Sequence, residues 1–175
     1  MDYRASLDGL AKAITWGTFV LFGLLVYTSI KEITVPQVDR KTMLIHSGII
    51  LLLISIIVVC YLLAPQSYKV NADYLTIVRA AGDKKIKLSD IAEVRALEEA
   101  EMKRAIRTFG VGGLFGYYGK YYASNIGRMT FYATQRRNKV FILTRAGDKI
   151  IITPDDLNII EKLRPAMQKK IISIA

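Results

Sequence analysis

Two long runs without Asp, Glu, Lys or Arg, Ala13–Ile30 and Met43–Leu63, constrain this chain more than any other feature. The second run has 21 residues. A helix rises about 1.5 Å per residue, so this run reaches about 31 Å, the thickness of a bilayer's hydrocarbon core. Trp16, Tyr27 and Tyr61 lie near the ends of the runs, as aromatic residues at a membrane interface do. The sequence therefore predicts two transmembrane helices, at about residues 11–30 and 43–63.

Two other interpretations of these runs fit less well. A cleaved signal peptide would end in small residues at a cleavage site, whereas the first run follows a leader with two acids and has no such site after it. A buried hairpin of a water-soluble protein rarely has two uncharged runs of this length. No charged residue lies deep in either run, so a transport or proton-relay function is not indicated. The runs are therefore interpreted as an anchor.

The polar connector at residues 31–42 contains Pro36 and is short, so both ends of the chain are expected on the same side of the membrane. Five basic residues lie close to the outer ends of the two runs, against three in the connector. Basic residues favour the cytoplasmic side. This bias predicts that both termini, and the domain that follows the runs, are cytoplasmic.

Charge and composition limit what the rest of the chain can do. The net charge is +10, and 20 basic residues stand against 11 acidic ones after Leu63. A basic domain tied to a membrane points to anionic lipid head groups or an acidic protein, and it makes nucleic acid an unlikely partner. The single Cys60 and the single His46 both lie in the second run. Neither a nucleophile–base pair nor a His/Cys metal cluster is therefore expected in the domain, and no cofactor is predicted.

From Tyr68 onward the pattern changes to alternating apolar and polar residues, which is typical of strands. A hairpin is predicted around the turn at residues 81–83, and further strands at residues 91–96, 129–134, 140–144 and 149–153. These give six or seven antiparallel strands. The chain then returns to helical spacing, with Thr153 as N-cap, Pro154 in the first position, two aspartates in the first turn and Pro165 as terminator. The predicted apolar face of this helix consists of Leu157, Ile160 and Leu163.

The segment between these strands is harder to interpret. Residues 97–110 are typical of a short amphipathic helix with a Glu99–Lys103 pair and Gly110 as its C-cap, although a strand fits too. Residues 110–122 alternate glycine with bulky side chains but lack the Lys-Ser/Thr of a phosphate-binding loop. Either these side chains fill the core, or they form an aromatic loop in the membrane interface, supported by Lys120 and Arg128. The candidate interfacial residues are Leu114, Phe115, Tyr117 and Tyr118.

Several motifs together carry a resemblance to a known family. The run RTFGVGGLFGYYGKYY is followed by the strand MTFYAT, the basic turn QRRNKV, the strand VFILT, the turn AGDK and TPDD before a helix. This pattern resembles the bacterial pleckstrin-homology-like (PH-like) domain family in its membrane-anchored form. The resemblance implies two roughly orthogonal antiparallel sheets capped by a C-terminal helix, and a location in the bacterial cytoplasmic (inner) membrane. It implies no catalytic residues.

The sequence thus predicts an α+β protein with a transmembrane hairpin at residues 1–65 and a PH-like domain at residues 66–175. Its expected function is that of a non-enzymatic, membrane-anchored interaction or regulatory module, which binds acidic head groups or a protein partner. A structural subunit that packs through its helices in a larger membrane complex is the main alternative, and an enzyme is the least favoured. The candidate binding residues are Lys84, Lys85, Lys87, Lys103, Arg104, Arg107, Lys120, Arg128, Arg136 and Arg137.

Overall fold

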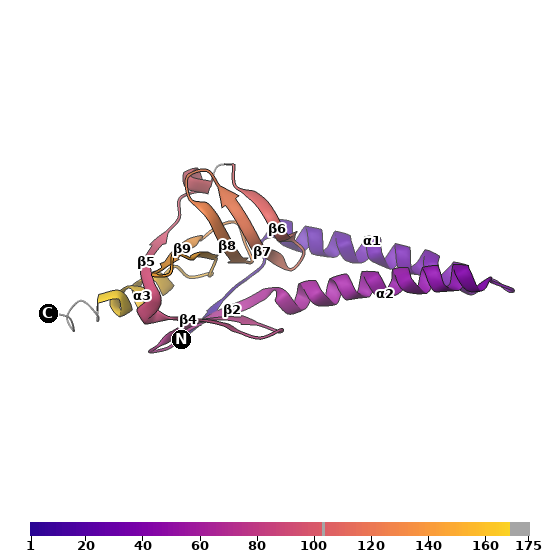
Figure 1. Ribbon diagram of the computed structural model, residues 1–175, viewed down its shortest axis with the longest axis horizontal. Helices are drawn as coiled ribbons and strands as arrows, with labels where there is room; N and C mark the ends of the chain where they lie inside the picture. Colours follow the sequence, from indigo (N-terminus) through magenta and orange to yellow (C-terminus); the bar gives the residue numbers. More distant parts are fainter. Residues whose placement is uncertain (103, 169–175) are drawn as a thin grey trace.

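A computed structural model describes residues 1–102 and 104–168, so the candidate Lys103 and the predicted Glu99–Lys103 pair lie outside the described residues. Two long helices lie side by side and project from one end of a domain of two sheets, which we call the sheet domain (Figure 1). The helices are α1 (Gly9–Ile33) and α2 (Arg40–Leu63), and both are long and apolar enough to cross a membrane. They extend a few residues beyond the predicted spans and leave a connector of only residues 34–39.

The helices form where the sequence supplies both apolar residues and caps. The Asp8 side chain accepts a hydrogen bond from the backbone N–H of Ala11 at the start of α1, and Asp39 accepts from the backbone N–H groups of Lys41 and Thr42 at the start of α2. Their apolar side chains point outward in all directions; Trp16 is 71% exposed and Leu51 is 68% exposed. A helix that is apolar all round needs an apolar surrounding. The hairpin therefore has the surface of a membrane anchor.

The first sheet contains four antiparallel strands in the order β1-β2-β3-β4. Strand β1 comes from the leader that precedes α1, and Tyr3 lies opposite Tyr68 of β2. The sequence analysis assigned this leader to the hairpin and predicted no strand there. Only Ala64 separates α2 from β2, so the second helix continues almost directly into the sheet. The bounds are β1 (Asp2–Arg4), β2 (Pro65–Val70), β3 (Tyr74–Arg79) and β4 (Lys84–Lys87).

The second sheet contains six strands in the order β5-β9-β10-β8-β7-β6. The described residues thus form ten strands, more than the six or seven predicted. The predicted antiparallel pairing holds except for β10 and β8, which run parallel, with Ile151 opposite Phe131. The bounds are β5 (Ile91–Ala96), β6 (Ile106–Gly113), β7 (Gly116–Ala123), β8 (Gly127–Ala133), β9 (Val140–Thr144) and β10 (Lys149–Ile152); short 3₁₀ turns lie at η1 (Leu88–Asp90) and η2 (Glu99–Met102).

The middle strands of the six-stranded sheet are buried on both faces. Ile142 of β9 and Ile150 of β10 face the main core, which fills the space between the sheets, while Phe141 and Ile151 point to a second cluster on the opposite face. This alternation follows from the two-residue period of a strand. Helix α3 (Ile159–Gln168) covers the main core at the end far from α1 and α2 (Figure 1). The two-sheet, helix-capped architecture that the sequence predicted is confirmed.

The start and end of the C-terminal helix were predicted wrongly. Helix α3 begins at Ile159, and Thr153 is buried in the sheet, where its hydroxyl accepts a hydrogen bond from the N–H of Thr134 at 2.9 Å. The Asp155 carboxylate accepts from Ser6 of the leader instead of capping the helix. Leu157 is exposed, so the buried face consists of Ile159, Ile160 and Leu163. Pro165 lies within the helix and does not end it.

The amphipathic helix predicted at residues 97–110 is also absent from the described structure. A single turn, η2, is helical there, and residues from Ile106 onward form β6. Gly110 is not a helix cap but lies in mid-strand, opposite Gly119 of β7. Pairing with β7 overrides the local helical pattern, because strand formation depends on the partner more than on propensity.

Candidate functional site on the helix-facing side

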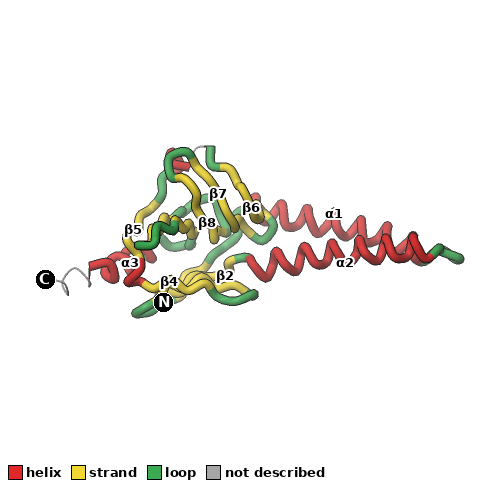
Figure 2. The backbone as a smooth tube through the Cα atoms, viewed as in Figure 1, coloured by secondary structure: helices red, strands yellow, loops and turns green. Residues whose placement is uncertain are grey.

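The turn between β6 and β7 lies between the two long helices, beside the start of α1 (Figure 2). The Phe115 ring contacts Phe19 of α1 and Tyr61 of α2 edge-to-face, with ring centroids 6.0 and 5.6 Å apart. The backbone N–H of Phe115 donates to the hydroxyl of Thr15, at 3.0 Å. The turn therefore joins both helices to the sheet domain.

Two glycines in facing strands allow the close approach on which this turn depends. Gly110 and Gly119 lie opposite each other with φ values of +112° and +125°. A Cβ atom on either residue would collide with a backbone oxygen of the other strand. Glycine is needed there for its conformation as well as its size. The glycine-aromatic run thus builds a tightly paired hairpin that reaches the helices.

Strand β7 adds a direct link to α2. The hydroxyl of Tyr118 donates to the carbonyl oxygen of Cys60 at 2.5 Å. The last carbonyl groups of a helix have no N–H donor from a following turn of the same helix. A hydrogen bond from Tyr118 therefore also stabilises the end of α2. Burial raises the pKa of Tyr118 above its ordinary value. Of the four candidate interfacial residues, Tyr118 is buried and Leu114, Phe115 and Tyr117 are half-buried.

Asp8 connects the start of α1 to two other parts of the domain. Its carboxylate accepts from the N–H of Ala11 at 2.8 Å, from the Tyr117 hydroxyl at 3.1 Å and from Nε of Arg136 at 3.0 Å. The side chain is only 7% exposed. Burial opposes the charged form of Asp8, but these hydrogen bonds outweigh it and hold the pKa below its ordinary value. Asp8 was not among the candidate residues, although an aspartate directly before an apolar helix is an N-cap signal.

The β3–β4 turn is attached to the end of α2. The backbone N–H of Ala81 donates to the carbonyl oxygen of Leu62 at 2.8 Å. Arg79 lies over the Tyr132 ring, with its guanidinium carbon 5.6 Å from the ring centroid. Lys84 is exposed and begins β4, three residues after this attachment. Arg79 and Lys84 therefore lie close to the level at which α2 leaves the sheet domain.

The predicted basic residues do not form one patch. Lys84, Lys85 and Lys87 follow one another along β4, an edge of the first sheet, while Arg136 and the exposed Arg137 lie in the β8–β9 loop near Asp8. The other described candidates are found on or beside β6, β7 and β8. These are Arg104, Arg107, Lys120 and Arg128.

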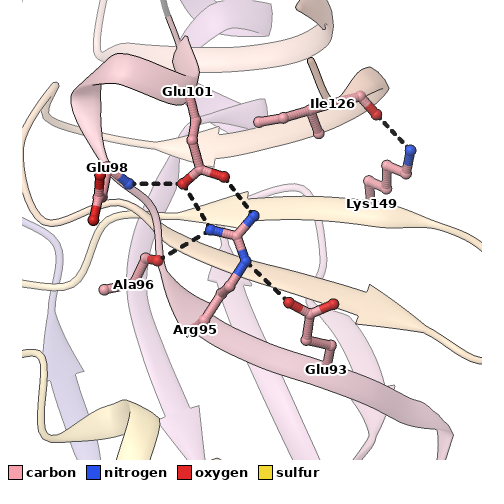
Figure 3. A network of polar contacts seen from close by, with 7 residues as sticks. All are labelled: Glu93, Arg95, Ala96, Glu98, Glu101, Ile126 and Lys149. Carbon is pink, nitrogen blue, oxygen red and sulfur yellow. Dashed lines mark hydrogen bonds and ion pairs between the residues drawn. The ribbon is translucent and has the colours of Figure 1, made fainter.

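An ion-pair network that the sequence analysis missed fixes the loop before β6. Arg95 of β5 donates two hydrogen bonds, each of 2.7 Å, to the carboxylate of Glu101 in η2, and a third of 2.9 Å to Glu93 (Figure 3). The side-chain hydrogen bond and the charge of Arg95 lower the pKa of Glu101. Arg95 also covers the Phe141 ring. This network holds η2 against the second apolar cluster.

Among the described residues, no group of three or more His, Cys, Asp or Glu side chains could hold a metal ion. The comparisons with known proteins concern the sheet domain. A family model described as bacterial PH domain matches residues 66–167, more than half of the chain. No curated protein and no solved structure matches significantly.

Proposed function

Because the chain belongs to the bacterial PH domain family, we propose that it is a non-enzymatic, membrane-anchored module that binds acidic lipid head groups at the surface of its own membrane. One observation carries this proposal: two basic loops of the sheet domain are attached to the ends of the apolar helices. Ala81 in the β3–β4 turn is bonded to Leu62 of α2, and Arg136 in the β8–β9 loop is bonded to Asp8, the cap of α1.

Attachment to the helix ends sets the depth of the loops. If α1 and α2 span the bilayer, Leu62 and Asp8 lie where the hydrocarbon core gives way to the head groups. Arg79 and Lys84 beside one helix and Arg137 beside the other then stand at head-group level. Each basic residue near an anionic surface contributes about 1 kcal/mol of attraction. Arg136 uses Nε to hold Asp8, and its other N–H donors are available to a phosphate.

The hairpin supplies the anchor in this proposal. Its exposed apolar surface favours insertion in a bilayer, and the basic residues beside its outer ends favour a cytoplasmic position for the sheet domain. With the β6–β7 turn seated between the helices, the domain is held in one orientation. The β3–β4 and β8–β9 loops then always face the lipid surface, which lowers the entropic cost of binding head groups.

Hydrogen exchange of the full-length chain in lipid nanodiscs tests the proposal. One set of discs contains phosphatidylcholine alone, and the other contains phosphatidylcholine mixed with phosphatidylglycerol. We expect slower amide exchange in the β3–β4 and β8–β9 loops in the anionic discs only. The double variant Lys84→Glu/Arg137→Glu should lose this protection, and Lys162→Glu on α3, at the opposite end of the domain, should keep it. Equal exchange in the two lipids would reject head-group binding.

A further inference from the structure

A cluster of exposed apolar side chains lies on the two outer strands β6 and β7 of the six-stranded sheet. In the described part of the chain beyond Leu63, the exposed large apolar residues are Ile106, Phe109, Tyr122 and Leu157. The first three lie on β6 and β7, where they are 58%, 77% and 41% exposed. Large apolar side chains gathered on an exposed part of a protein surface are typical of an interaction site.

The register puts these three side chains on one face. Ile106 lies opposite Tyr122, and Phe109 lies opposite Lys120, two residues before Tyr122 on β7. Residues two apart in a strand point to the same side, and so do residues directly opposite each other. Arg128 of β8 lies opposite Tyr122 and joins the same face. Strand β6 is last in the sheet order, so its outer edge has no partner strand among the described residues.

Lys120 and Arg128 lie on the same face as this apolar cluster, whereas Arg107 lies opposite Tyr121 and points to the other face of the sheet. In the described part of the chain, Arg107, Lys120 and Arg128 form no ion pair. Lys120 donates a hydrogen bond to the Thr130 hydroxyl at 2.8 Å and is otherwise exposed. A hollow of about 510 Å³ lies between Lys120, Arg128 and the β9–β10 turn; its lining also includes Phe109, Thr130 and Asp148.

We infer that the outer edge of β6 binds an extended, acidic segment of a partner protein, which pairs with it as an additional strand. The free edge offers backbone hydrogen bonds to such a segment. Ile106, Phe109 and Tyr122 offer contacts to its apolar side chains, and the neighbouring cations pair with its carboxylates. This surface is separate from the two loops of the proposed head-group site, so the two functions stand independently.

The charge of the surface favours an acidic partner over a second copy of this chain. If the β6 edges of two copies were paired with each other, Arg107 of both copies would lie at the same interface. Lys120 and Arg128 of both copies would lie nearby. Like charges that face each other across paired strands are destabilising. An acidic strand instead provides opposite charges at each of these positions.

Peptide binding to the full-length chain in neutral phosphatidylcholine nanodiscs tests this inference without anionic lipid. The probe is a fluorescent peptide of alternating Glu and Val, about as long as β6. We expect it to bind, and the single changes Phe109→Ser and Lys120→Glu each to weaken binding about tenfold. Leu157→Ser, at an exposed apolar position outside the cluster, should leave binding unchanged. Hydrogen exchange should slow in β6 and stay constant in β4, the edge of the other sheet.

Several results would overturn the inference. The first is equal binding of a peptide of alternating Lys and Val, and the second is equal binding of a Glu–Val peptide methylated at alternate backbone nitrogens. Absence of any binding would also reject it. Crosslinking from position 109 to the same position of a second copy would identify β6 as a self-association edge instead. Because Phe109 is exposed, its replacement by Ser leaves the fold intact, and lost binding would report on the surface itself.

Discussion

The Tyr118 hydroxyl lies 2.5 Å from the Cys60 carbonyl oxygen and joins strand β7 to the last turn of α2. Sequence positions far apart thus meet where the sheet domain leaves the helices. Phe115 packs between the helices, and Asp8 links the start of α1 to the sheet domain. Together with the Tyr118 bond, these contacts hold the hairpin and the sheet domain together. A head-group surface or a partner strand would then be held at a fixed position relative to the bilayer.

Removal of the Tyr118 hydroxyl should loosen this joint. In Tyr118→Phe the Cys60 carbonyl oxygen loses the hydroxyl that donates to it in a partly buried place, at a cost of about 0.5–1.5 kcal/mol. We expect faster amide exchange in the last turn of α2 and in the β6–β7 turn. Tyr122→Phe is the matched control, because its exposed hydroxyl makes no hydrogen bond to the described residues. Equal exchange in the two variants would show that the bond contributes nothing to the joint.

Local patterns predicted the elements whose signal lies within a few residues. The two apolar runs predicted α1 and α2, and the strand pattern predicted β3, β4, β5, β8, β9 and β10. The errors arose where distant residues decide the outcome. Residues 106–110 belong to the predicted helix but pair with β7, and Thr153 has the character of an N-cap but its hydroxyl accepts a hydrogen bond from the N–H of Thr134. Strand β1 in the leader forms because it pairs with β2, and no pattern within the leader itself indicates this pairing.

The same distinction holds for the candidate site. Basic residues could be selected by type, and Lys84, Arg136 and Arg137 do lie near the helix ends. Their separation from Lys120 and Arg128 depends on the strand order, which places β4 and β7 in different sheets. The aromatic residues of the β6–β7 turn were expected in the core or the interface. Phe115 packs against Phe19 and Tyr61, because the turn reaches the helices.

Replacement of Gly119 by alanine should destabilise the domain strongly. The new Cβ would collide with the Phe109 carbonyl oxygen, and φ of +125° is already unfavourable for alanine. We expect a loss of about 3 kcal/mol or more in the free energy of unfolding. Gly147→Ala separates the two causes, since Gly147 has a φ of +88° but open space around it, and should lose about 1–2 kcal/mol. Chemical denaturation in detergent measures both, and equal losses would exclude the collision as a cause.

The Arg95–Glu101 pair should contribute modestly and respond to salt. Its side chains are 37% and 30% exposed, so solvent screens the attraction despite the two-bond geometry. A double-mutant cycle with Arg95→Gln and Glu101→Gln should give a coupling energy of about 0.5–1 kcal/mol that falls in high salt. Lys69 and Asp2, 3.9 Å apart and more exposed, provide the comparison pair and should show less coupling. A coupling energy that salt leaves unchanged would contradict this account.

Acid should weaken the attachment of α1 through Asp8. The pKa of Asp8 is lower in the folded chain than its ordinary value of 3.8. Its contribution to stability is therefore complete above that value and is lost as the pH falls through the folded pKa.

The variant Asp8→Asn retains a cap but cannot be ionised, so it should be less stable at neutral pH and should approach the wild type in acid. Thermal unfolding in detergent across the acidic range measures the difference, which we expect to be about 1–2 kcal/mol at neutral pH. Asp39→Asn at the start of α2 also loses a capping charge, but the Asp39 carboxylate forms no ion pair with an arginine of the described residues. If both variants lost the same pH-dependent amount of stability, the capping charge alone would explain the effect. The hydrogen bonds of Asp8 to Arg136 and Tyr117 would then contribute nothing to the attachment of α1.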